Sequence, residues 1–126
     1  MKKLVVDLDS TITLGDTSDY RNVSPNIEVI QQLTSYKDKG FTITIFTARN
    51  MRTYKGNVGL INIHTLPIIT EWLAKHSVPY DEIIVGKPWC GKEGFYIDDR
   101  AIRPSEFASM SFEEITELLD KEKSCF

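Results

Sequence analysis

Side chains able to do chemistry stand in four short groups, each at the end of an apolar run. The groups are Asp7, Asp9 and Thr11; Thr47; Lys87; and Asp98 with Asp99. Carboxylates that converge on one place repel each other, so such a cluster persists when a cation sits among them. Because the groups contain no His or Cys, the fitting cation is a hard one that prefers oxygen, and Mg²⁺ is the natural candidate. A hydroxyl and an ammonium beside the metal could hold an anion. The set therefore predicts a phosphoryl-transfer site.

The strands that would position these groups can be predicted from apolar and β-branched runs. Such runs occur at residues 3–8, 41–46, 83–86 and 94–97, and a chemical group stands at the end of each. Any one of these side chains could simply cap a turn, because Asp and Thr often do so where strands end. Their recurrence after every predicted strand favours a shared site.

Helices are predicted between the strands. Ser24-Pro25 offers a capping hydroxyl and a proline for the start of a helix that ends at Gly40. A second helix is predicted over about residues 65–76, and a last one begins at Ser111, where Glu114 completes a capping box. Strands separated by helices imply crossover connections and a mainly parallel sheet covered on both faces. The expected fold is α/β, a Rossmann-like three-layer sandwich that binds ligands at the carboxyl ends of its strands.

Composition sets further bounds. The 126 residues are 41% hydrophobic and 26% charged, which fits a single globular domain over residues 1–126. Cys90 and Cys125 make no disulfide framework, so a reducing, cytoplasmic setting is expected. The apolar run that precedes Asp7 is too short for a signal peptide or a membrane span. A net charge of −3 argues against a dedicated nucleic-acid binder, whose surface is usually basic.

The first group has the form Asp-Leu-Asp-Ser-Thr, which resembles the DxDxT signature of phosphatases of the haloacid dehalogenase (HAD) superfamily. Thr47, at the end of Ile-Phe-Thr, resembles the second motif of that family, and Lys87 resembles the third. Asp98-Asp99 after Phe-Tyr-Ile resembles the fourth. The four motifs occur in the family's order within residues 4–100. The resemblance implies a Mg²⁺-dependent phosphatase.

By this resemblance, Asp7 attacks phosphorus and forms an aspartyl-phosphate, which water then hydrolyses. Asp9 would protonate the leaving oxygen and later activate the attacking water. Thr11 is expected to support the loop by hydrogen bonding. The ligands implied for Mg²⁺ are the carboxylate of Asp7, the backbone carbonyl of Asp9, Asp98 and, directly or through water, Asp99.

The resemblance also implies how the phosphate is held. Thr47 would donate a hydrogen bond to a phosphoryl oxygen, and Lys87 would neutralise the charge that builds up there. Lys92 stands on the same segment and could take that place, but Lys87 directly follows the predicted strand and is preferred. Arg49 and Asn50 complete the predicted substrate-binding residues, although Arg49 could equally form a surface ion pair.

No cap domain is expected, because only about a dozen residues separate Thr11 from the predicted helix at Pro25. Residues 51–64 could partly cover the crevice or form an ordinary solvated loop. In an open site, water must be excluded by the substrate or by another copy of the chain in a homo-oligomer. Small capless HAD proteins similar to this one include phosphatases of capsule and polysaccharide biosynthesis. That likeness favours a phosphorylated sugar or glycan precursor as the substrate.

Two other functions stay open at this stage. An open site would also admit a macromolecule, either a phosphoprotein or a nucleic-acid end, and the motifs do not separate transfer to water from transfer to another acceptor. Alternatively, the chain could be a binding module that keeps the HAD fold without turnover. All of the motif residues are present, which favours the enzyme.

Overall fold

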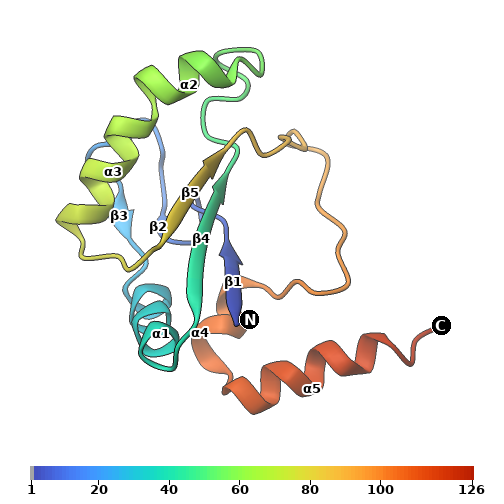
Figure 1. The fold of residues 1–126 in the computed structure, drawn as a ribbon. Helices are drawn as coiled ribbons and strands as arrows, with labels where there is room; N and C mark the ends of the chain where they lie inside the picture. The colour runs from blue at the N-terminus through green and yellow to red at the C-terminus, as the bar shows by residue number, and fades with distance from the viewer. Residues whose placement is uncertain (1) are drawn as a thin grey trace. The chain divides into compact units, whose positions relative to one another are not determined.

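Three parallel strands form the central sheet, in the order β1-β4-β5 (Figure 1). The computed structural model describes residues 2–126, and the chain divides into two compact units, Met1–Trp89 and Cys90–Phe126. The sheet belongs to the first unit and consists of β1 (Lys3–Val6), β4 (Thr42–Thr47) and β5 (Glu82–Val85). It is an open sheet flanked by helices, so the predicted Rossmann-like α/β fold with a mainly parallel sheet is confirmed.

One face of the sheet carries the apolar core. Val6 of β1 pairs with Ile45 of β4, and Ile45 pairs with Ile83 of β5. Directly paired residues of neighbouring strands point to the same face, so these side chains lie side by side. Ile43 and Ile45 are fully buried, as expected for the central strand of a parallel sheet.

Polar contacts fix the starts of the strands. The carboxylate of Asp81, just before β5, accepts a hydrogen bond of 2.7 Å from the backbone N–H of Ile43 and another from the ammonium of Lys37. The Lys37 hydrogen bond is the main reason why the pKa of Asp81 lies below its usual value, and the Ile43 N–H acts in the same direction. Glu82 accepts in the same way from Lys3, at 3.0 Å, and from the hydroxyl of Thr44. These contacts join all three strands at one end, opposite to the chemical groups.

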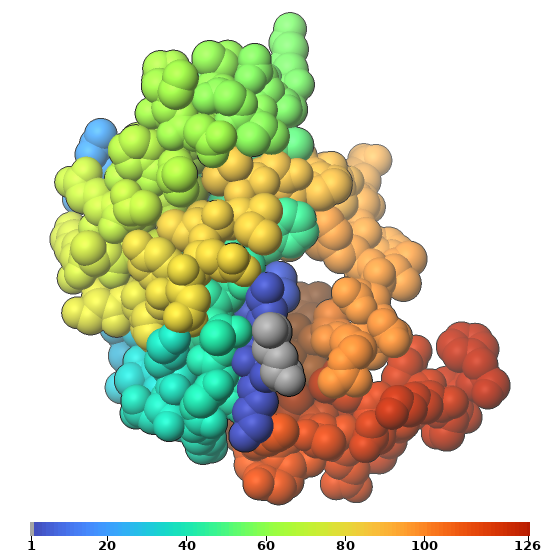
Figure 2. All heavy atoms as spheres, viewed as in Figure 1, coloured from blue at the N-terminus to red at the C-terminus, as the bar shows by residue number. Residues whose placement is uncertain are grey.

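Helices make both crossovers. α1 (Ile27–Asp38) connects β1 to β4, while α2 (Val58–His64) and α3 (Leu66–Lys75) connect β4 to β5. α2 packs beside α3 and also contacts β5, and the green and yellow atoms of these elements adjoin in Figure 2. The helical side chains buried in this unit are those at helical spacing: Val29, Ile30, Leu33 and Tyr36 in α1, Ile61 in α2, and Ile69, Trp72 and Leu73 in α3.

The predicted helix start at Ser24-Pro25 is wrong. Ser24–Pro25 is strand β3, which pairs antiparallel with β2 (Thr13–Leu14). The helix begins at Ile27 instead, because the side chain of Asn26 accepts a hydrogen bond from the backbone N–H of Val29 and caps it. The prediction failed since Ser-Pro and Asn are both good helix-start signals, and here the later one forms the cap.

The expected irregular stretch over residues 51–64 is also corrected. Its second half is α2, capped by Asn57, whose side chain accepts from the N–H of Leu60 at 3.2 Å. The prediction for residues 65–76 was close, because α3 runs from Leu66 to Lys75. Apart from β4, the elements between β1 and β5 are therefore the β2–β3 ribbon and the crossover helices, all within the first unit.

The second unit contains two helices, α4 (Pro104–Ser109) and α5 (Phe112–Glu122). The predicted capping box is confirmed: Ser111 accepts from the N–H of Glu114, whose carboxylate accepts from the N–H of Ser111. No helix within residues 2–126 combines the length and apolar character needed to cross a membrane.

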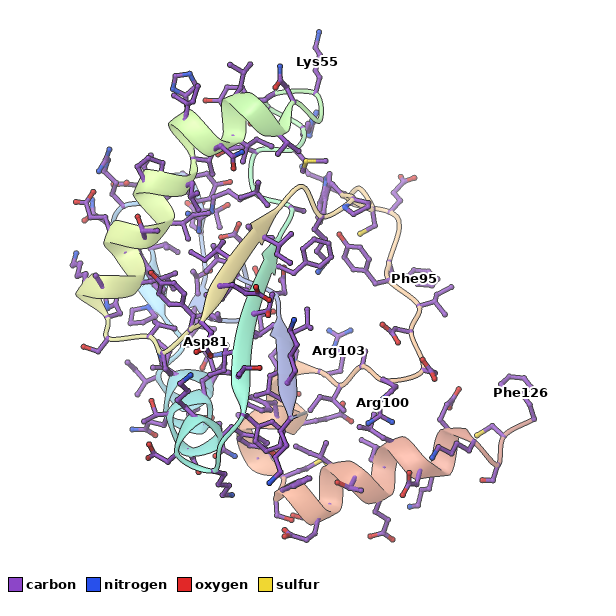
Figure 3. The ribbon with its side chains drawn as sticks, in the orientation of Figure 1. Lys55, Asp81, Phe95, Arg100, Arg103 and Phe126 are labelled. Carbon is purple, nitrogen blue, oxygen red and sulfur yellow. The ribbon has the colours of Figure 1, made fainter. Side chains whose placement is uncertain are left out.

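The predicted strand at residues 94–97 is wrong, because this segment has no strand partner. Phe95, labelled in Figure 3, is 76% exposed and Ile97 is 89% exposed. Gly94 approaches the backbone of Cys90 so closely that a Cβ would lie 2.3 Å from the Cys90 carbonyl oxygen. A run of β-forming residues makes a strand only when another strand supplies its hydrogen bonds, and the residue pattern does not report whether one does.

Two isoleucines on adjacent helices test the position of the core. Ile69 of α3 is 0% exposed and Ile63 of α2 is 66% exposed. We expect Ile69→Ala to lower the free energy of unfolding by about 2–5 kcal/mol, because it removes buried methyl groups and leaves a cavity. Ile63→Ala, the matched control, should change it by less than about 1 kcal/mol. Urea unfolding measures both values, and equal losses would contradict this account of the core.

Candidate active site

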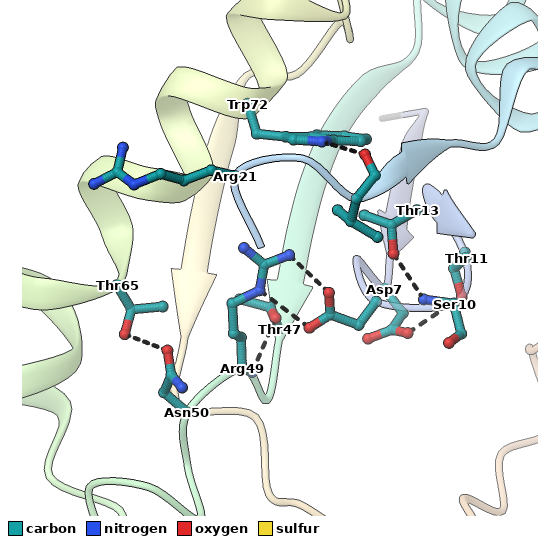
Figure 4. A network of polar contacts seen from close by, with 12 residues as sticks. Asp7, Ser10, Thr11, Thr13, Arg21, Thr47, Arg49, Asn50, Thr65 and Trp72 are labelled. Carbon is teal, nitrogen blue, oxygen red and sulfur yellow. Dashed lines mark hydrogen bonds and ion pairs between the residues drawn. The ribbon is translucent and has the colours of Figure 1, made fainter. Parts of the chain in front are cut away.

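Asp7 and Lys87 come together at the carboxyl end of the sheet. Asp7 directly follows β1, and its Oδ1 lies 3.4 Å from the Nζ of Lys87, a residue 80 positions further along the chain. The other carboxylate oxygen, Oδ2, accepts a hydrogen bond of 3.2 Å from the hydroxyl of Thr11 (Figure 4). The side chain of Asp7 is 35% exposed and that of Lys87 is 17% exposed. The site therefore presents a carboxylate to solvent between a hydroxyl and an ammonium.

A tight turn sets the position of Thr11. The carbonyl oxygen of the buried Leu8 accepts from the N–H groups of Thr11, Ile12 and Thr13 at 3.3, 2.9 and 3.1 Å. Ser10 takes a positive φ of 62° in this turn, and its N–H donates to the hydroxyl of Thr13 at 3.1 Å. The chain thus reverses within a few residues of β1, and Thr11 returns to the Asp7 carboxylate.

A glycine places Lys87. β5 ends at Val85, and Gly86 follows with a φ of 89°, a conformation that L side chains rarely adopt. A Cβ at Gly86 would also lie only 3.1 Å from a methyl carbon of Val58 in α2. The N–H of Lys87 then donates to the carbonyl oxygen of Thr47 at 3.1 Å. Between the two predicted alternatives, it is Lys87 that lies at Asp7, while Lys92 belongs to the second unit.

Asp9 is paired with Arg49. Arg49 Nε donates to Asp9 Oδ2 at 3.1 Å, and Arg49 Nη2 donates to Asp9 Oδ1 at 2.7 Å. The Arg49 side chain is 1% exposed and that of Asp9 is 26% exposed. The ion pair is therefore buried on the arginine side, whereas the sequence left open a surface ion pair or an anion-binding arginine. A role for Arg49 in substrate binding stays a prediction.

Thr47 and Arg49 are linked through the backbone. Thr47 is the last residue of β4, and its hydroxyl accepts a hydrogen bond of 3.1 Å from the N–H of Arg49. Thr47 itself is 1% exposed. Asp7 is thus more open to solvent than Thr47.

Asn50 holds the loop after β4. It has a positive φ of 62°, its amide nitrogen donates to the hydroxyl of Thr53 at 3.1 Å, and its amide oxygen accepts from the hydroxyl of Thr65 at 2.7 Å. Thr65 is the residue before α3. The side chain of Asn50 therefore ties the loop to the start of α3. Its predicted contact with substrate stays untested.

The loop over residues 51–57 turns partly outward. Arg52 and Lys55 are exposed, and Lys55 projects from the tip of the loop in Figure 3. Tyr54 is half-buried and stacks on the ring of His64 at 5.8 Å between ring centroids. A contribution of this loop to substrate recognition stays a prediction.

The fourth group belongs to the second unit. Asp98, Asp99 and Arg100 are all exposed, and the N–H of Arg100 donates to the carboxylate of Asp98 at 2.9 Å. Among residues 2–126, no three His, Cys, Asp or Glu side chains gather as a ready metal site. The predicted site residues thus form two contact groups: Asp7 with Thr11 and Lys87, and Arg49 with Asp9 and Thr47. Mg²⁺ ligation by Asp98 and Asp99 stays a prediction.

Sequence reasoning missed one neighbour of this set. The ring of Tyr20 lies under the Arg49 guanidinium, with 4.0 Å between the guanidinium carbon and the ring centroid. Tyr20 stands in the connection from β2 to β3, and nothing in the spacing of this tyrosine marks it as part of the site.

The role of Asn50 can be tested with two substitutions. Asn50→Ala removes two hydrogen bonds and strains a positive φ, so we expect it to lower the free energy of unfolding by about 1–3 kcal/mol. Asn50→Gly removes the same bonds but tolerates the backbone conformation, so it should lose less. Urea unfolding compares them. Equal, negligible losses would show that Asn50 does not hold the loop.

Comparison with known proteins gives one strong likeness. No protein-family model and no curated protein matches the chain. Two chains from structures of the Pnkp1/Rnl/Hen1 RNA repair complex are 21% identical to it, with TM-scores of 0.50 and 0.52. They match 67% and 86% of this chain, but this chain spans only 25% and 34% of theirs, and the likeness shows the fold alone.

A crystal structure of an MCSG target from Vibrio cholerae is far more similar. It is 73% identical with a TM-score of 0.95, and the match covers 97% of this chain and 99% of the Vibrio cholerae chain. At that identity over nearly the whole of both chains, the protein belongs to the same family as its Vibrio cholerae relative.

Proposed function

We propose that the protein is a Mg²⁺-dependent phosphomonoesterase of the HAD type, with Asp7 as its nucleophile. The observation that carries the proposal is the setting of Asp7. Its carboxylate stands at the end of β1, partly open to solvent, with the Thr11 hydroxyl on one oxygen and the Lys87 ammonium near the other. A carboxylate in this position can reach an incoming phosphate, and the ammonium offsets the negative charge that builds up around it.

In the first step, an oxygen of Asp7 attacks phosphorus while the bond from phosphorus to the ester oxygen breaks. The leaving oxygen takes a proton and departs as an alcohol, and the phosphoryl group stays on Asp7. In the second step, water attacks phosphorus, gives up a proton, and releases phosphate from Asp7. The family resemblance assigns both proton transfers to Asp9.

The pairing of Asp9 with Arg49 is compatible with this role. Each carboxylate oxygen has two lone pairs, and Arg49 engages each oxygen once. One lone pair on each oxygen is left for a proton. Thr47 is similar, because its hydroxyl accepts from the Arg49 N–H and keeps its own proton for a phosphoryl oxygen.

The donor atoms of the site fit Mg²⁺. Asp7 and Asp9 offer only oxygen, which this hard cation prefers, and no His or Cys is among the motif residues. The Asp7 carboxylate and the Asp9 carbonyl would hold the ion, with Asp98 and Asp99 as the further ligands that the family resemblance implies. The ion would supply positive charge to the phosphoryl oxygens.

The proposed substrate is a phosphorylated sugar or glycan precursor. Within the first unit, the connections between β1 and β5 consist of β4, the β2–β3 ribbon, the crossover helices and loops, which supports a member of the family without an inserted cap there. A second candidate is a phosphorylated nucleic-acid end. The observation that favours it is the fold likeness to chains of an RNA repair complex, and the net charge of −3 weighs against it.

Replacement of the nucleophile tests the mechanism. We expect Asp7→Asn to lower Mg²⁺-dependent phosphate release by on the order of 10³-fold or more, because the amide oxygen is a far weaker nucleophile. Asp120→Asn, which removes an exposed carboxylate that pairs with Lys123, is the matched control and should leave the rate unchanged. Release should also stop when EDTA removes the metal and return with added Mg²⁺.

The substrate panel contains sugar phosphates, nucleotides, a phosphopeptide and a 3′-phosphorylated oligonucleotide. The highest kcat/KM separates the small-molecule candidate from the macromolecular ones. Phosphate release that persists in Asp7→Asn, or that needs no divalent cation, would defeat the proposed mechanism.

A further inference from the structure

The geometry points to Arg49 as a positioning residue that aims Asp9, with the Tyr20 ring holding the Arg49 guanidinium in place. This inference rests on the proposed function, since it concerns the proposed acid and base of that reaction. It starts from the environment of Arg49. The side chain is 1% exposed, although Arg is among the residues least often buried, and burial of a cation is unfavourable unless partners compensate.

The first compensating partner is Asp9. Two hydrogen bonds, at 3.1 and 2.7 Å, join the planar guanidinium to the planar carboxylate. One such bond would let the carboxylate rotate, whereas a bidentate pair fixes the orientation of its plane. Because the Arg49 N–H also donates to the Thr47 hydroxyl, the same residue fixes Asp9 to the end of β4.

The second partner is Tyr20. Arg49 Nη1 is buried and has no hydrogen-bond partner among residues 2–126, so the arginine is not held by hydrogen bonds alone. The Tyr20 ring lies 4.0 Å from the guanidinium carbon, close enough for its π-face to attract the cation. Tyr20 comes from the β2–β3 connection, so this ribbon contributes a side chain next to Asp9 and Arg49.

This arrangement favours the positioning role of Arg49 over anion binding. An arginine that meets a substrate phosphate must offer its N–H groups to solvent, and here Nε and Nη2 are engaged by Asp9 while Nη1 is covered. The burial of Arg49 therefore supports action through Asp9, and Asp9, at 26% exposed, is the member of the pair that the solvent reaches.

The rates on two substrates of similar shape can show whether Asp9 is correctly placed as an acid. Phenyl phosphate and 4-nitrophenyl phosphate differ by one nitro group, but 4-nitrophenolate leaves without help from an acid and phenolate leaves much more readily when protonated. A misplaced Asp9 should therefore slow phenyl phosphate more. A general loss of folded protein would slow both esters equally.

Arg49→Lys keeps the positive charge but removes the bidentate hydrogen bonding to the Asp9 carboxylate. We expect kcat/KM to fall at least about ten-fold more on phenyl phosphate than on 4-nitrophenyl phosphate, within the range that a general acid contributes. Asp9→Asn should give the largest loss with the same preference. Tyr20→Leu should act in the same direction but more weakly, and Tyr20→Phe should recover most of the rate because it restores the ring face.

Equal losses of kcat/KM on the two esters in Arg49→Lys, or no loss, would overturn the inference. The proposed function would still stand if the unmutated protein releases phosphate through Asp7. An unmutated protein that releases phosphate through Asp7 from neither ester nor any member of the substrate panel would instead defeat the proposed function. Thermal unfolding of each variant checks folding. If Arg49→Lys does not fold, the Tyr20→Leu and Tyr20→Phe pair decides the question with the same two esters.

Discussion

Repulsion between Asp7 and Asp9 is the constraint on which the site depends. Two carboxylates so close in the chain, at the end of one strand, repel each other, and positive charge beside them offsets that repulsion. The first unit places one cation at each, Lys87 at Asp7 and Arg49 at Asp9. These cations come from the carboxyl ends of the two other strands, 80 and 40 positions along the chain from their partners. Only a parallel arrangement gathers three such ends at one edge, so the crossover helices are required by the electrostatics as well as by the core.

Residues with positive φ follow each of the three strands at this edge. The chain must turn sharply after each strand, close to the residue that the strand contributes to the site. Ser10 follows β1 with a φ of 62°, Asn50 follows β4 with a φ of 62°, and Gly86 follows β5 with a φ of 89°. Side chains other than glycine disfavour this region, and asparagine tolerates it better than most. The polar contacts around Asp81 and Glu82 lie at the opposite end of the strands, where Gly40 and Ser77 also take positive φ before β4 and β5.

How much the sequence could predict differs from feature to feature, for physical reasons. The strands around Val6, Ile45 and Ile83 are apolar runs whose burial depends on residue type, so their pattern sufficed to predict a parallel sheet and the meeting of Asp7 with Lys87. Residues 94–97 have the same character, yet they form no strand, because pairing depends on a neighbour that lies elsewhere in the chain.

Side-chain pairing was the least predictable part of the site. Nothing local distinguishes an arginine that binds a substrate from one buried against Asp9 and Tyr20, since both would follow a strand and both would be charged. The α2 helix was missed for a related reason: Val58, Leu60 and Ile63 are apolar but exposed, so they give no stripe that separates a buried face from a solvated one.

Charge balance links the described contacts to the proposed cofactor. In the first unit, Asp7 and Asp9 contribute two negative charges and Lys87 and Arg49 two positive ones, so these four side chains sum to zero. A phosphate monoester would add about −1.5 to −2 charges at neutral pH. Since both cations are already engaged by carboxylates, binding the ester at Asp7 would leave that charge uncompensated where water is partly excluded. A divalent cation is the smallest addition that restores neutrality. If the substrate is a phosphate ester, as proposed, the pairing of each carboxylate with its own cation is a further reason to propose that a metal ion such as Mg²⁺ binds together with the phosphate.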